Sequence, residues 1–362
     1  MPFDTTFTRR LGLRHPIIQG PFGGGLSSVD LVVAVAQAGG LGSFGAHHLG
    51  PDEIVEVAAA IRARTAGPFN LNLWVSDHDA DGLTPTPEQF AQGVARHRPF
   101  YDELGIAPPA SPPRHYGERF DAQMPAILEA RPPVFSFAFG IPPQETLEEC
   151  RRRSIVSLGA VTTVDEALAM ESAGVDAIVA TGFEAGGHRV SFLRAAEDSL
   201  TGTFALIPQV VDRVKIPVVA AGGIVDARGV AAAFALGAHA VQVGTAFLAC
   251  EESNASPLHR AALFSERAKT TVLSRAYSGR LARGIRNRFT DVLLSNGTAP
   301  LPYPAQNWFT GSFKQAAIAQ GRDDFIALWS GQAAPLLRHR TAKALFDELA
   351  AVHSTIQEET YR

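Results

Sequence analysis

Two short apolar runs, VVAAGG at residues 218–223 and AVQVGT at residues 240–245, decide the fold of this chain. Each run has the composition of a buried strand and ends in small residues. An amphipathic helical pattern, Ala227–Leu236, separates them. A strand, a helix and a second strand in this order predict a right-handed crossover and parallel strand pairing.

The same alternation extends from residue 16 to about residue 248. Helical patterns such as Val29–Gln37, Pro51–Arg64 and Val164–Ser172 lie between the apolar runs. The predicted strands are Pro16–Gln19, Leu41–Phe44, Phe69–Val75, Val134–Phe139, Ile155–Leu158, Ala177–Ala180, Pro217–Ala221 and Ala240–Val243. This repetition predicts an α/β fold of the TIM type, a (β/α)8 barrel. A doubly wound open sheet is the rival, and the lack of a Gly-rich dinucleotide turn after the first strand counts against it.

Small residues follow several of the predicted strands. They are Gly20-Pro21, Gly45-Ala46, Gly182, Gly222-Gly223 and Gly244-Thr245. In a barrel these positions share the C-terminal face, where active sites are built. Any single glycine can be explained as a tight turn. The pair of loops after the last two strands instead favours a shared phosphate site made from backbone N–H groups.

Two segments do not fit the repeat and predict insertions after strands 3 and 8. Residues 76–131 contain a Pro-rich stretch at 108–113, and residues 250–310 contain a basic run from Arg275 to Arg288. We predict a barrel formed by residues 1–249 and 311–362, with an insertion at about 76–131, and a smaller substrate or lid insertion at 250–310. A returning helix, Phe313–Gln320, and a helical tail, Thr341–Gln357, complete the chain. The arginine run is interpreted as the solvated face of a helix, with attraction of an anionic substrate as the alternative.

Composition narrows the class of protein. The chain has 362 residues, 46% apolar residues, 19% charged residues and a net charge of −4, which gives no sign of a nucleic-acid-binding surface. It lacks a signal-peptide pattern and an apolar run long enough to span a membrane. The two cysteines, Cys150 and Cys250, suit a reducing compartment, and the spacing of the 11 histidines predicts no metal site. We therefore expect a cytoplasmic protein with no nucleic-acid or membrane partner.

The stretch GFEAGGHR, residues 182–189, carries the strongest candidate for catalysis. It follows a predicted strand, and its glycines allow a ligand to approach the backbone before His188. An isolated histidine is more often structural, but the predicted strand-end position favours a role as acid, base or orienting group. Asn72 alternates with apolar neighbours on the third strand, so its amide needs a partner, which is a ligand, backbone or water. Glu184 is interpreted as a solvated or salt-bridged carboxylate without a catalytic role.

Taken together and in order, five motifs resemble the nitronate monooxygenase family, formerly called 2-nitropropane dioxygenases. They are Gln-Gly-Pro at residues 19–21, Asn-Leu-Asn at 70–72, Gly-Phe-Glu-Ala-Gly-Gly-His at 182–188, Ala-Ala-Gly-Gly-Ile at 220–224 and Val-Gln-Val-Gly-Thr-Ala-Phe at 241–247. The resemblance covers most of the predicted barrel. It implies an enzyme with flavin mononucleotide (FMN) that oxidises alkyl nitronates with molecular oxygen.

The resemblance also implies roles for individual residues. His188 would be the catalytic histidine, and Tyr303 and Gln332 would line the substrate pocket. The implied cofactor-binding residues are Pro21, Phe22, Gly23, Asn72, Thr181, Gly186, Gly187, Gly222, Gly223, Gly244 and Thr245. Among these, the first three would lie near the flavin ring, Asn72 would bond its polar edge, and the last four would hold the phosphate.

The chain departs from the family pattern at several positions that bear on the substrate. Phe22 stands where many relatives have Met, Thr181 where many have Gln, and Val190 where Gly is common. The fifth strand lacks a lysine that some relatives place against the flavin, having Ala160 in that region. Propionate 3-nitronate is the substrate that the family implies, and a homo-oligomer is left open.

Three other functions compete with a nitronate oxidase. One is an FMN-dependent NAD(P)H reductase of the enoyl-thioester type, from the same superfamily. Another is a flavin-free phosphate-binding barrel that acts as a lyase or isomerase. The third is a non-catalytic barrel that binds a ligand. Each competing function places its ligand on the same face of the barrel.

Overall fold

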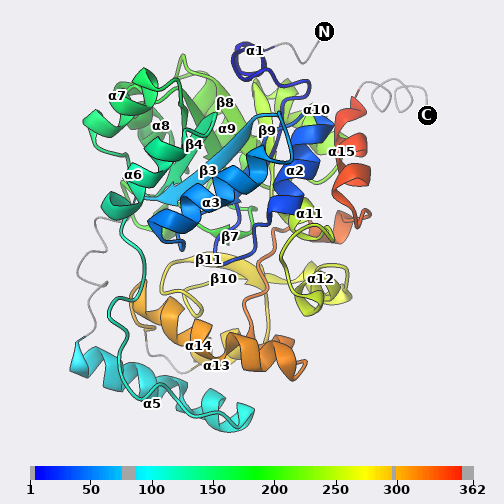
Figure 1. The fold of residues 1–362 in the computed structure, drawn as a ribbon. Coiled ribbons are helices and arrows are strands. Elements are labelled where there is room, and N and C mark those ends of the chain that lie inside the picture. Colours follow the sequence, from blue (N-terminus) through cyan, green and yellow to red (C-terminus); the bar gives the residue numbers. More distant parts are fainter. Residues whose placement is uncertain (1–4, 76–85, 296–298, 353–362) are drawn as a thin grey trace.

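The computed structural model describes residues 5–75, 86–295 and 299–352, and its centre is a closed barrel of parallel strands (Figure 1). The sheet has eight strands in the order β1-β9-β8-β6-β5-β4-β3-β2. These strands are β1 (Ile17–Gln19), β2 (Gly42–Gly45), β3 (Phe69–Trp74), β4 (Val134–Ala138), β5 (Val156–Val161), β6 (Ala177–Thr181), β8 (Val218–Ala221) and β9 (Ala240–Val243). The predicted (β/α)8 barrel is confirmed, and each predicted strand overlaps an observed one.

Backbone hydrogen bonds between the first two strands close the barrel. Gln19 N donates to Leu41 O and Leu41 N donates to Ile17 O, each at 2.9 Å. The neighbouring pair of β1 and β9 is in parallel register, with Ile18 opposite Gln242. Closure leaves the strands with no free edge, so all their carboxyl ends meet at one mouth of the barrel.

Helices surround the barrel and begin at capping residues in the sequence. Ser28, Thr163 and Asp226 each accept a hydrogen bond from a backbone N–H in the first turn of the helix that follows, and these contacts satisfy a donor that the helix leaves free. The outer helices are α2 (Val29–Ala38), α3 (Pro51–Arg62), α6 (Phe120–Ala130), α7 (Gln144–Arg152), α8 (Val164–Ser172), α9 (Thr203–Val211), α10 (Ala227–Ala235) and the returning α15 (Ala342–Ala350).

Side chains fill the inside of the barrel at its amino-terminal end. Ile18, Leu158, Val179 and Val219 are buried there in one apolar cluster. Phe7, on the short helix α1 (Thr6–Leu11), belongs to the same cluster and is 2% exposed. The packed interior at that end directs any ligand to the opposite mouth.

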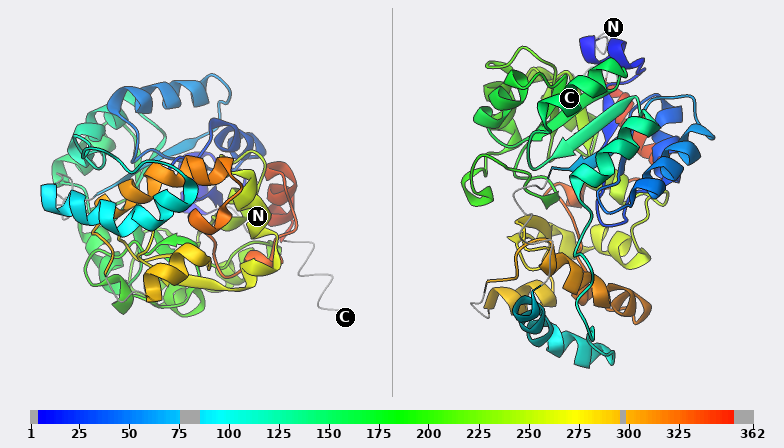
Figure 2. Two further views of the ribbon diagram at one scale, coloured as in Figure 1. Left: turned by 90° about the horizontal axis from the view of Figure 1, so that it is seen from below. Right: turned by 60° about the vertical axis from the view of Figure 1, so that its left-hand side comes forward.

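A smaller helical part lies beyond the carboxyl ends of the strands (Figure 2). It has its own apolar core, which includes Phe100, Tyr277, Phe289 and Phe313. Its elements are β7 (Gly187–His188), β10 (Thr271–Ser274), β11 (Ala282–Ile285), α5 (Pro87–Leu104), α12 (Pro257–Leu263), α13 (Arg288–Ser295) and α14 (Ala305–Ala319). Seen from below, α5 and α14 lie side by side across the end of the barrel (Figure 2).

The observed elements refine the two predicted insertions. In the first, α5 packs against α14 of the smaller part, whereas α6 packs on α3 of the barrel. Residues 76–85 of that insertion and 353–357 of the predicted tail lie outside the described residues. The predicted boundary between residues 310 and 311 falls inside α14, and the chain regains the barrel at α15, which packs on α2. The exact division into two parts stays a prediction.

The arginine run was interpreted wrongly as a solvated helix face. Residues 271–285 form the antiparallel pair β10 and β11, and Arg280 and Arg283 are buried at 8% and 3% exposure. The outward arginines pair with carboxylates, such as Arg275 with Glu197 and Arg288 with Glu103. The charge pattern misled because a strand hairpin can bury the aliphatic stems and planar ends of arginines.

The close packing of α2 on β2 can be tested by a substitution at Gly42. A Cβ at Gly42 would lie 2.3 Å from the carbonyl oxygen of Val32 in α2. We expect Gly42→Ala to lower the free energy of unfolding by about 1–3 kcal/mol through overpacking. Urea denaturation followed by circular dichroism measures it.

Gly311 provides the matched control, because it lies in α14 and has no atom within 4 Å of an added Cβ. Gly311→Ala should be neutral or stabilise by up to about 1 kcal/mol. Equal stability of the two variants would contradict the packing of α2 on β2.

Candidate active site

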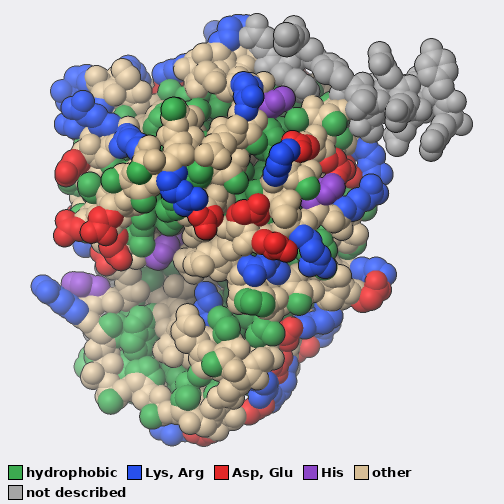
Figure 3. Space-filling view, turned by 45° about the vertical axis from the view of Figure 1, so that its right-hand side comes forward, with side chains coloured by type: hydrophobic (Ala, Val, Ile, Leu, Met, Phe, Trp, Pro, Cys, Tyr) green, Lys and Arg blue, Asp and Glu red, His purple; other side chains and the backbone are tan. Residues whose placement is uncertain are grey.

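A cavity of about 270 Å³ opens at the carboxyl ends of the barrel strands, under the smaller part. The surface is recessed between these two parts of the molecule (Figure 3). The cavity brings together twelve residues singled out in the sequence: Pro21, Phe22, Gly23, Asn72, Thr181, Gly186, Gly187, His188, Gly222, Gly223, Gly244 and Thr245. The chain therefore assembles one continuous site from strand β3 and the loops that follow β1, β6, β8 and β9.

The loops after β8 and β9 form a cradle at one end of the cavity. Gly222 and Gly223 have φ values of 107° and 73°, which only glycine adopts without strain. An added Cβ at Gly244 would have no atom within 4 Å, so this backbone faces open space. Thr245 Oγ1 accepts a hydrogen bond from Gly331 N at 2.9 Å, which joins the cradle to the smaller part. The backbone N–H groups of this cradle could therefore hold an anion such as phosphate.

Glu184 fixes the loop beside this cradle. Its carboxylate accepts hydrogen bonds from Thr203 N and Thr203 Oγ1, each at 2.9 Å. Thr203 Oγ1 also lies 3.1 Å from Gly222 O. The carboxylate thus ties the β6 loop to the start of α9, and it forms no salt bridge with another described residue. These contacts position the loop, whereas the sequence analysis interpreted Glu184 as a solvated or salt-bridged carboxylate.

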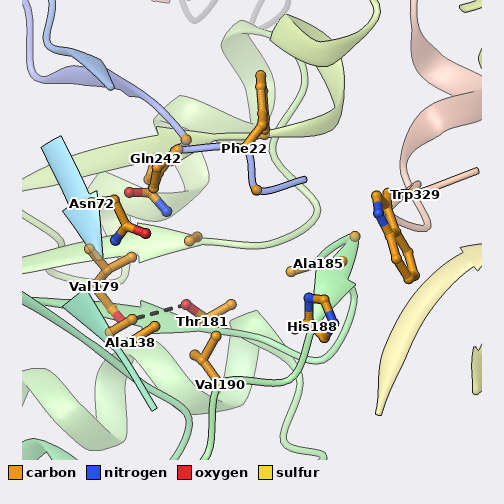
Figure 4. Close-up of a pocket in the computed structure, with 18 of the residues that line it drawn as sticks. Phe22, Asn72, Ala138, Val179, Thr181, Ala185, His188, Val190, Gln242 and Trp329 are labelled. Atoms are coloured by element: carbon orange, nitrogen blue, oxygen red, sulfur yellow. Dashed lines mark hydrogen bonds between the residues drawn. The ribbon is translucent and has the colours of Figure 1, made fainter. Parts of the chain in front are cut away.

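Amide side chains form the floor of the cavity. Asn72 Nδ2 donates to Ser136 Oγ at 2.9 Å, and Asn70 Nδ2 donates to the same oxygen at 2.8 Å. Asn72 and Gln242 extend toward one another from β3 and β9, with Thr181 below them (Figure 4). Ser136 forms a hydrogen bond only with Nδ2 of Asn72. Oδ1 of Asn72 is therefore available to a planar polar ligand.

The loop after β1 forms the wall opposite the β6 loop. Ser27 Oγ accepts from Phe22 N at 3.1 Å and donates to Phe22 O at 2.9 Å, and it also accepts from Gly45 N. Gly23 is in tight contact with side chains, since a Cβ there would lie 2.5 Å from His47 Cε1. One serine therefore holds the loop flat against the second strand.

His188 lies in the short strand β7, and the hairpin of the smaller part positions it. It pairs with Ala282 of β11, and its Nε2 is 2.8 Å from Ser278 Oγ in the turn between β10 and β11. Ser278 is 1% exposed, and its hydroxyl also lies 3.2 Å from Arg280 O. Burial lowers the pKa of His188 from 6.5 to about 4, so the imidazole is neutral near pH 7.

Buried charged residues hold the segment that follows His188. The Arg189 guanidinium donates to the backbone oxygens of Thr181, Gly182 and Ser199. The Glu166 carboxylate accepts from Phe192 N at 2.7 Å. These contacts connect residues 181–199 to one another and to α8. The histidine is consequently presented from a rigid support.

Aromatic rings surround the end of the cavity at His188. The ring centroid of His188 is 5.1 Å from Trp74 and 5.4 Å from Trp329, and Figure 4 shows Trp329 facing it from the smaller part. The Arg280 guanidinium lies 3.7 Å from the Phe139 ring centroid and 4.1 Å from that of Tyr303. Burial lowers the pKa of Arg280 to about 10, so it keeps its positive charge near neutral pH.

The two residues predicted to contact the substrate occupy different places. Tyr303 is half-buried beside Trp74, at a centroid distance of 5.6 Å, next to the residues that line the cavity. Gln332 has an exposed side chain outside the cavity lining, and its backbone N donates to Glu184 O at 2.9 Å. Their contact with a substrate stays a prediction.

Known proteins resemble this chain over its whole length. The nitronate monooxygenase family matches residues 5–351. A probable nitronate monooxygenase of Staphylococcus haemolyticus is 37% identical over 359 residues, covering 98% of this chain and 99% of the relative. A probable nitronate monooxygenase of Staphylococcus aureus is 38% identical over 344 residues, covering 94% and 95%.

The chain belongs to the nitronate monooxygenase family. Nitroalkane oxidase from Streptomyces ansochromogenes has a similar structure, with a TM-score of 0.86, 34% identity and coverage of 98% and 100%. FabK from Thermotoga maritima is also similar, with a TM-score of 0.75, 28% identity and 99% coverage of each chain. Membership confirms the resemblance inferred from the five motifs and the prediction of an enzyme, a flavin-dependent oxidoreductase.

Sequence reasoning missed several residues that shape the cavity. Trp74 lies two positions after Asn72 on one strand, and that alternation was a usable signal because such residues share a face. Ser278, Arg280 and Trp329 come from the smaller part, and no local pattern predicts where they lie. His47, one of the histidines whose spacing predicts no metal site, also lines the cavity. No described helix is long and apolar enough to cross a membrane.

The lowered pKa of His188 predicts a pH effect on stability. The unfolded chain takes up a proton near pH 6.5, whereas folded His188 does so only near pH 4. The unfolded state therefore binds more protons in this window, and stability falls as the pH falls through it. We expect His188→Asn to lose less stability than the wild type between about pH 6.5 and pH 4. Urea denaturation at stepped pH measures the difference, and parallel losses would contradict a neutral buried imidazole.

Proposed function

We propose that this enzyme binds FMN and oxidises alkyl nitronates with molecular oxygen, propionate 3-nitronate being one candidate substrate. One observation carries the proposal. A glycine cradle, an amide floor and a neutral histidine line a single cavity, in a chain that belongs to the nitronate monooxygenase family. The name of the similar nitroalkane oxidase agrees with a nitro compound as the substrate.

The cavity fits FMN by the chemistry of its lining. Gly222, Gly223, Gly244 and Thr245 would hold the phosphate through backbone N–H groups that no Cβ obstructs. The flat loop at residues 21–23 and the backbone of residues 186–187 would contact the ring, and Asn72 would bond its polar edge. When bound, FMN supplies the electron-accepting chemistry and the reactivity toward oxygen.

His188 is the residue proposed to handle the proton of the substrate. Its Nε2 is engaged with Ser278, so Nδ1 is the nitrogen left for a ligand. If the Ser278 hydroxyl donates a hydrogen bond to Arg280 O, it accepts a hydrogen bond from the Nε2–H group of His188. Nδ1 of His188 then carries the lone pair. A neutral imidazole in that tautomer can remove a proton from a neutral nitroalkane. The opposite tautomer would hydrogen-bond an anionic nitronate.

The surroundings of His188 supply electrostatics and exclude water. Arg280 carries a buried positive charge near this end of the cavity, which favours an anion such as a nitronate. The indole rings of Trp74 and Trp329 cover His188 from two sides and keep water away. Thr181 and Val190, two positions of departure from relatives, also line the cavity and are proposed to set its substrate range.

We also propose the cellular compartment and the binding partners of the enzyme. Its partners are the small-molecule nitronate and oxygen, and a homo-oligomer is compatible with the fold. Cys150 and Cys250 are free and buried, which supports a reducing compartment such as the cytoplasm.

An absorbance spectrum followed by an anaerobic titration tests the function. We expect purified protein to show FMN bands that bleach when a nitronate is added without oxygen, and to consume oxygen steadily in air. His188→Asn should keep the bands and lose at least about tenfold in kcat/KM on a neutral nitroalkane. Bleaching by NADPH alone, with none by a nitronate, would favour the reductase. Protein that binds no FMN would favour a flavin-free barrel.

Replacement of Ser278 tests how His188 is oriented. Ser278→Ala removes the only hydrogen bond that the side chain of His188 makes in the described part of the chain. We expect kcat/KM to fall about tenfold, because one buried hydrogen bond of this kind is worth about 1–1.5 kcal/mol. Ser278→Thr keeps the hydroxyl and should retain most activity. Oxygen-electrode kinetics on both variants give the answer, and wild-type activity in Ser278→Ala would show that packing alone orients the ring.

A further inference from the structure

His47 contributes a second imidazole to the cavity, which the proposed function has not used. It follows β2 and lines the cavity together with Gly23, Trp74 and His188. Gly23 leaves room for its ring, because a Cβ there would overlap Cε1 and lie 3.3 Å from Nε2. A residue larger than glycine at position 23 would displace the imidazole.

Trp74 links the two imidazoles at one end of the cavity. The His47 ring stacks face to face on the indole, with a centroid distance of 3.7 Å and an interplanar angle of 3°. His188 meets the same indole edge-on at 5.1 Å and 74°. One indole side chain therefore contacts both imidazoles. Both imidazoles line the same cavity.

The polar atoms of His47 have no protein partner in the described residues. Its Nδ1 is buried without a hydrogen bond, and no hydrogen bond joins Nε2 to another described residue. A buried polar atom left unsatisfied costs about 1–3 kcal/mol, and most native proteins satisfy such atoms. A Phe side chain would stack on Trp74 without this cost. An imidazole that carries this cost is explained if its other nitrogen, Nε2, bonds a ligand in the cavity.

The charge state of His47 suits a hydrogen bond to an anion. Burial, and then the charges of His48, His188 and Arg280, hold its pKa well below 6.5. The ring is neutral near pH 7, so one of its nitrogens carries a proton and the other does not. With Nδ1 enclosed by protein, Nε2 is the atom that a ligand in the cavity can reach.

We propose that His47 is a second substrate-binding residue. Its Nε2 donates a hydrogen bond to an oxygen of the bound nitronate. His188, which also contacts Trp74, acts on the same substrate. This inference rests on the proposed function. It predicts that two imidazoles share the recognition of the nitro group. Removal of the proton from the substrate carbon is still assigned to His188.

Nitrate is a suitable probe, because it is a planar anion with the O–N–O arrangement of a nitronate. Its Kd is measured by thermal shift, since a ligand that binds the folded state raises its stability in proportion to ln(1 + [L]/Kd). The KM for a nitronate is measured in parallel on FMN-loaded enzyme. For His47→Phe, which keeps an aromatic ring on Trp74, we expect both constants to rise at least about tenfold, as loss of a hydrogen bond to a charged group predicts. The ratio of flavin to protein absorbance should stay at the wild-type value.

Two further variants complete the test. His47→Gln places an amide nitrogen near the position of Nε2 and should bind nitrate within about threefold of the wild type. His115→Phe makes the same change at an exposed histidine outside the cavity lining and should match the wild type. Wild-type Kd for nitrate in His47→Phe, or no saturable binding by the wild type, would overturn the proposal. Loss of FMN with unchanged nitrate binding would also overturn it and assign His47 to the cofactor.

The nitrate titration separates this inference from the proposed function. If the wild type oxidises no nitronate, the proposed function fails. The titration on the same protein still decides whether His47 binds a nitro-like anion. If the wild type oxidises nitronates and His47→Phe behaves normally, only the role of His47 fails.

Discussion

Closure of the barrel by the backbone hydrogen bonds between β1 and Leu41 is the constraint on which the site depends. Closure brings the carboxyl ends of all the strands in the sheet to one mouth. Loops that are far apart in sequence, such as those at Gly23 and Gly222, then face one cavity. An open sheet would spread these loops along a line. The apolar cluster that includes Ile18 fills the other end of the barrel, so a ligand binds at the mouth.

The smaller part of the molecule completes the site by supplying the groups that orient it. Ser278 bonds the catalytic candidate His188, and Gly331 bonds Thr245 at the cradle. Trp329 covers the imidazole from the same side. The barrel therefore carries most of the positions proposed to bind the cofactor, whereas the proposed role of the histidine depends on contacts across the junction of the two parts.

Burial sets the electrostatics of the reacting end. The imidazoles of His47 and His188 are both neutral near pH 7, because removal from water disfavours the charged form. Arg280 keeps its charge in the same surroundings because its pKa stays near 10. The site consequently combines one permanent positive charge with two neutral rings, an arrangement suited to binding an anion and moving a proton.

The sequence by itself determined the barrel, the cradle and the position of His188 at a strand end. The periodicity of strands and helices is a local property of the sequence. Gly222 and Gly223 stand where the backbone has a positive φ, which glycine adopts without strain. Only the tertiary structure decided the partners of His188, the burial of Arg280 and Arg283, and the meeting of His47 with Trp74. Those contacts join residues that lie between 23 and 141 positions apart in the sequence. Local sequence patterns do not predict these contacts, because the contacts arise from packing between elements.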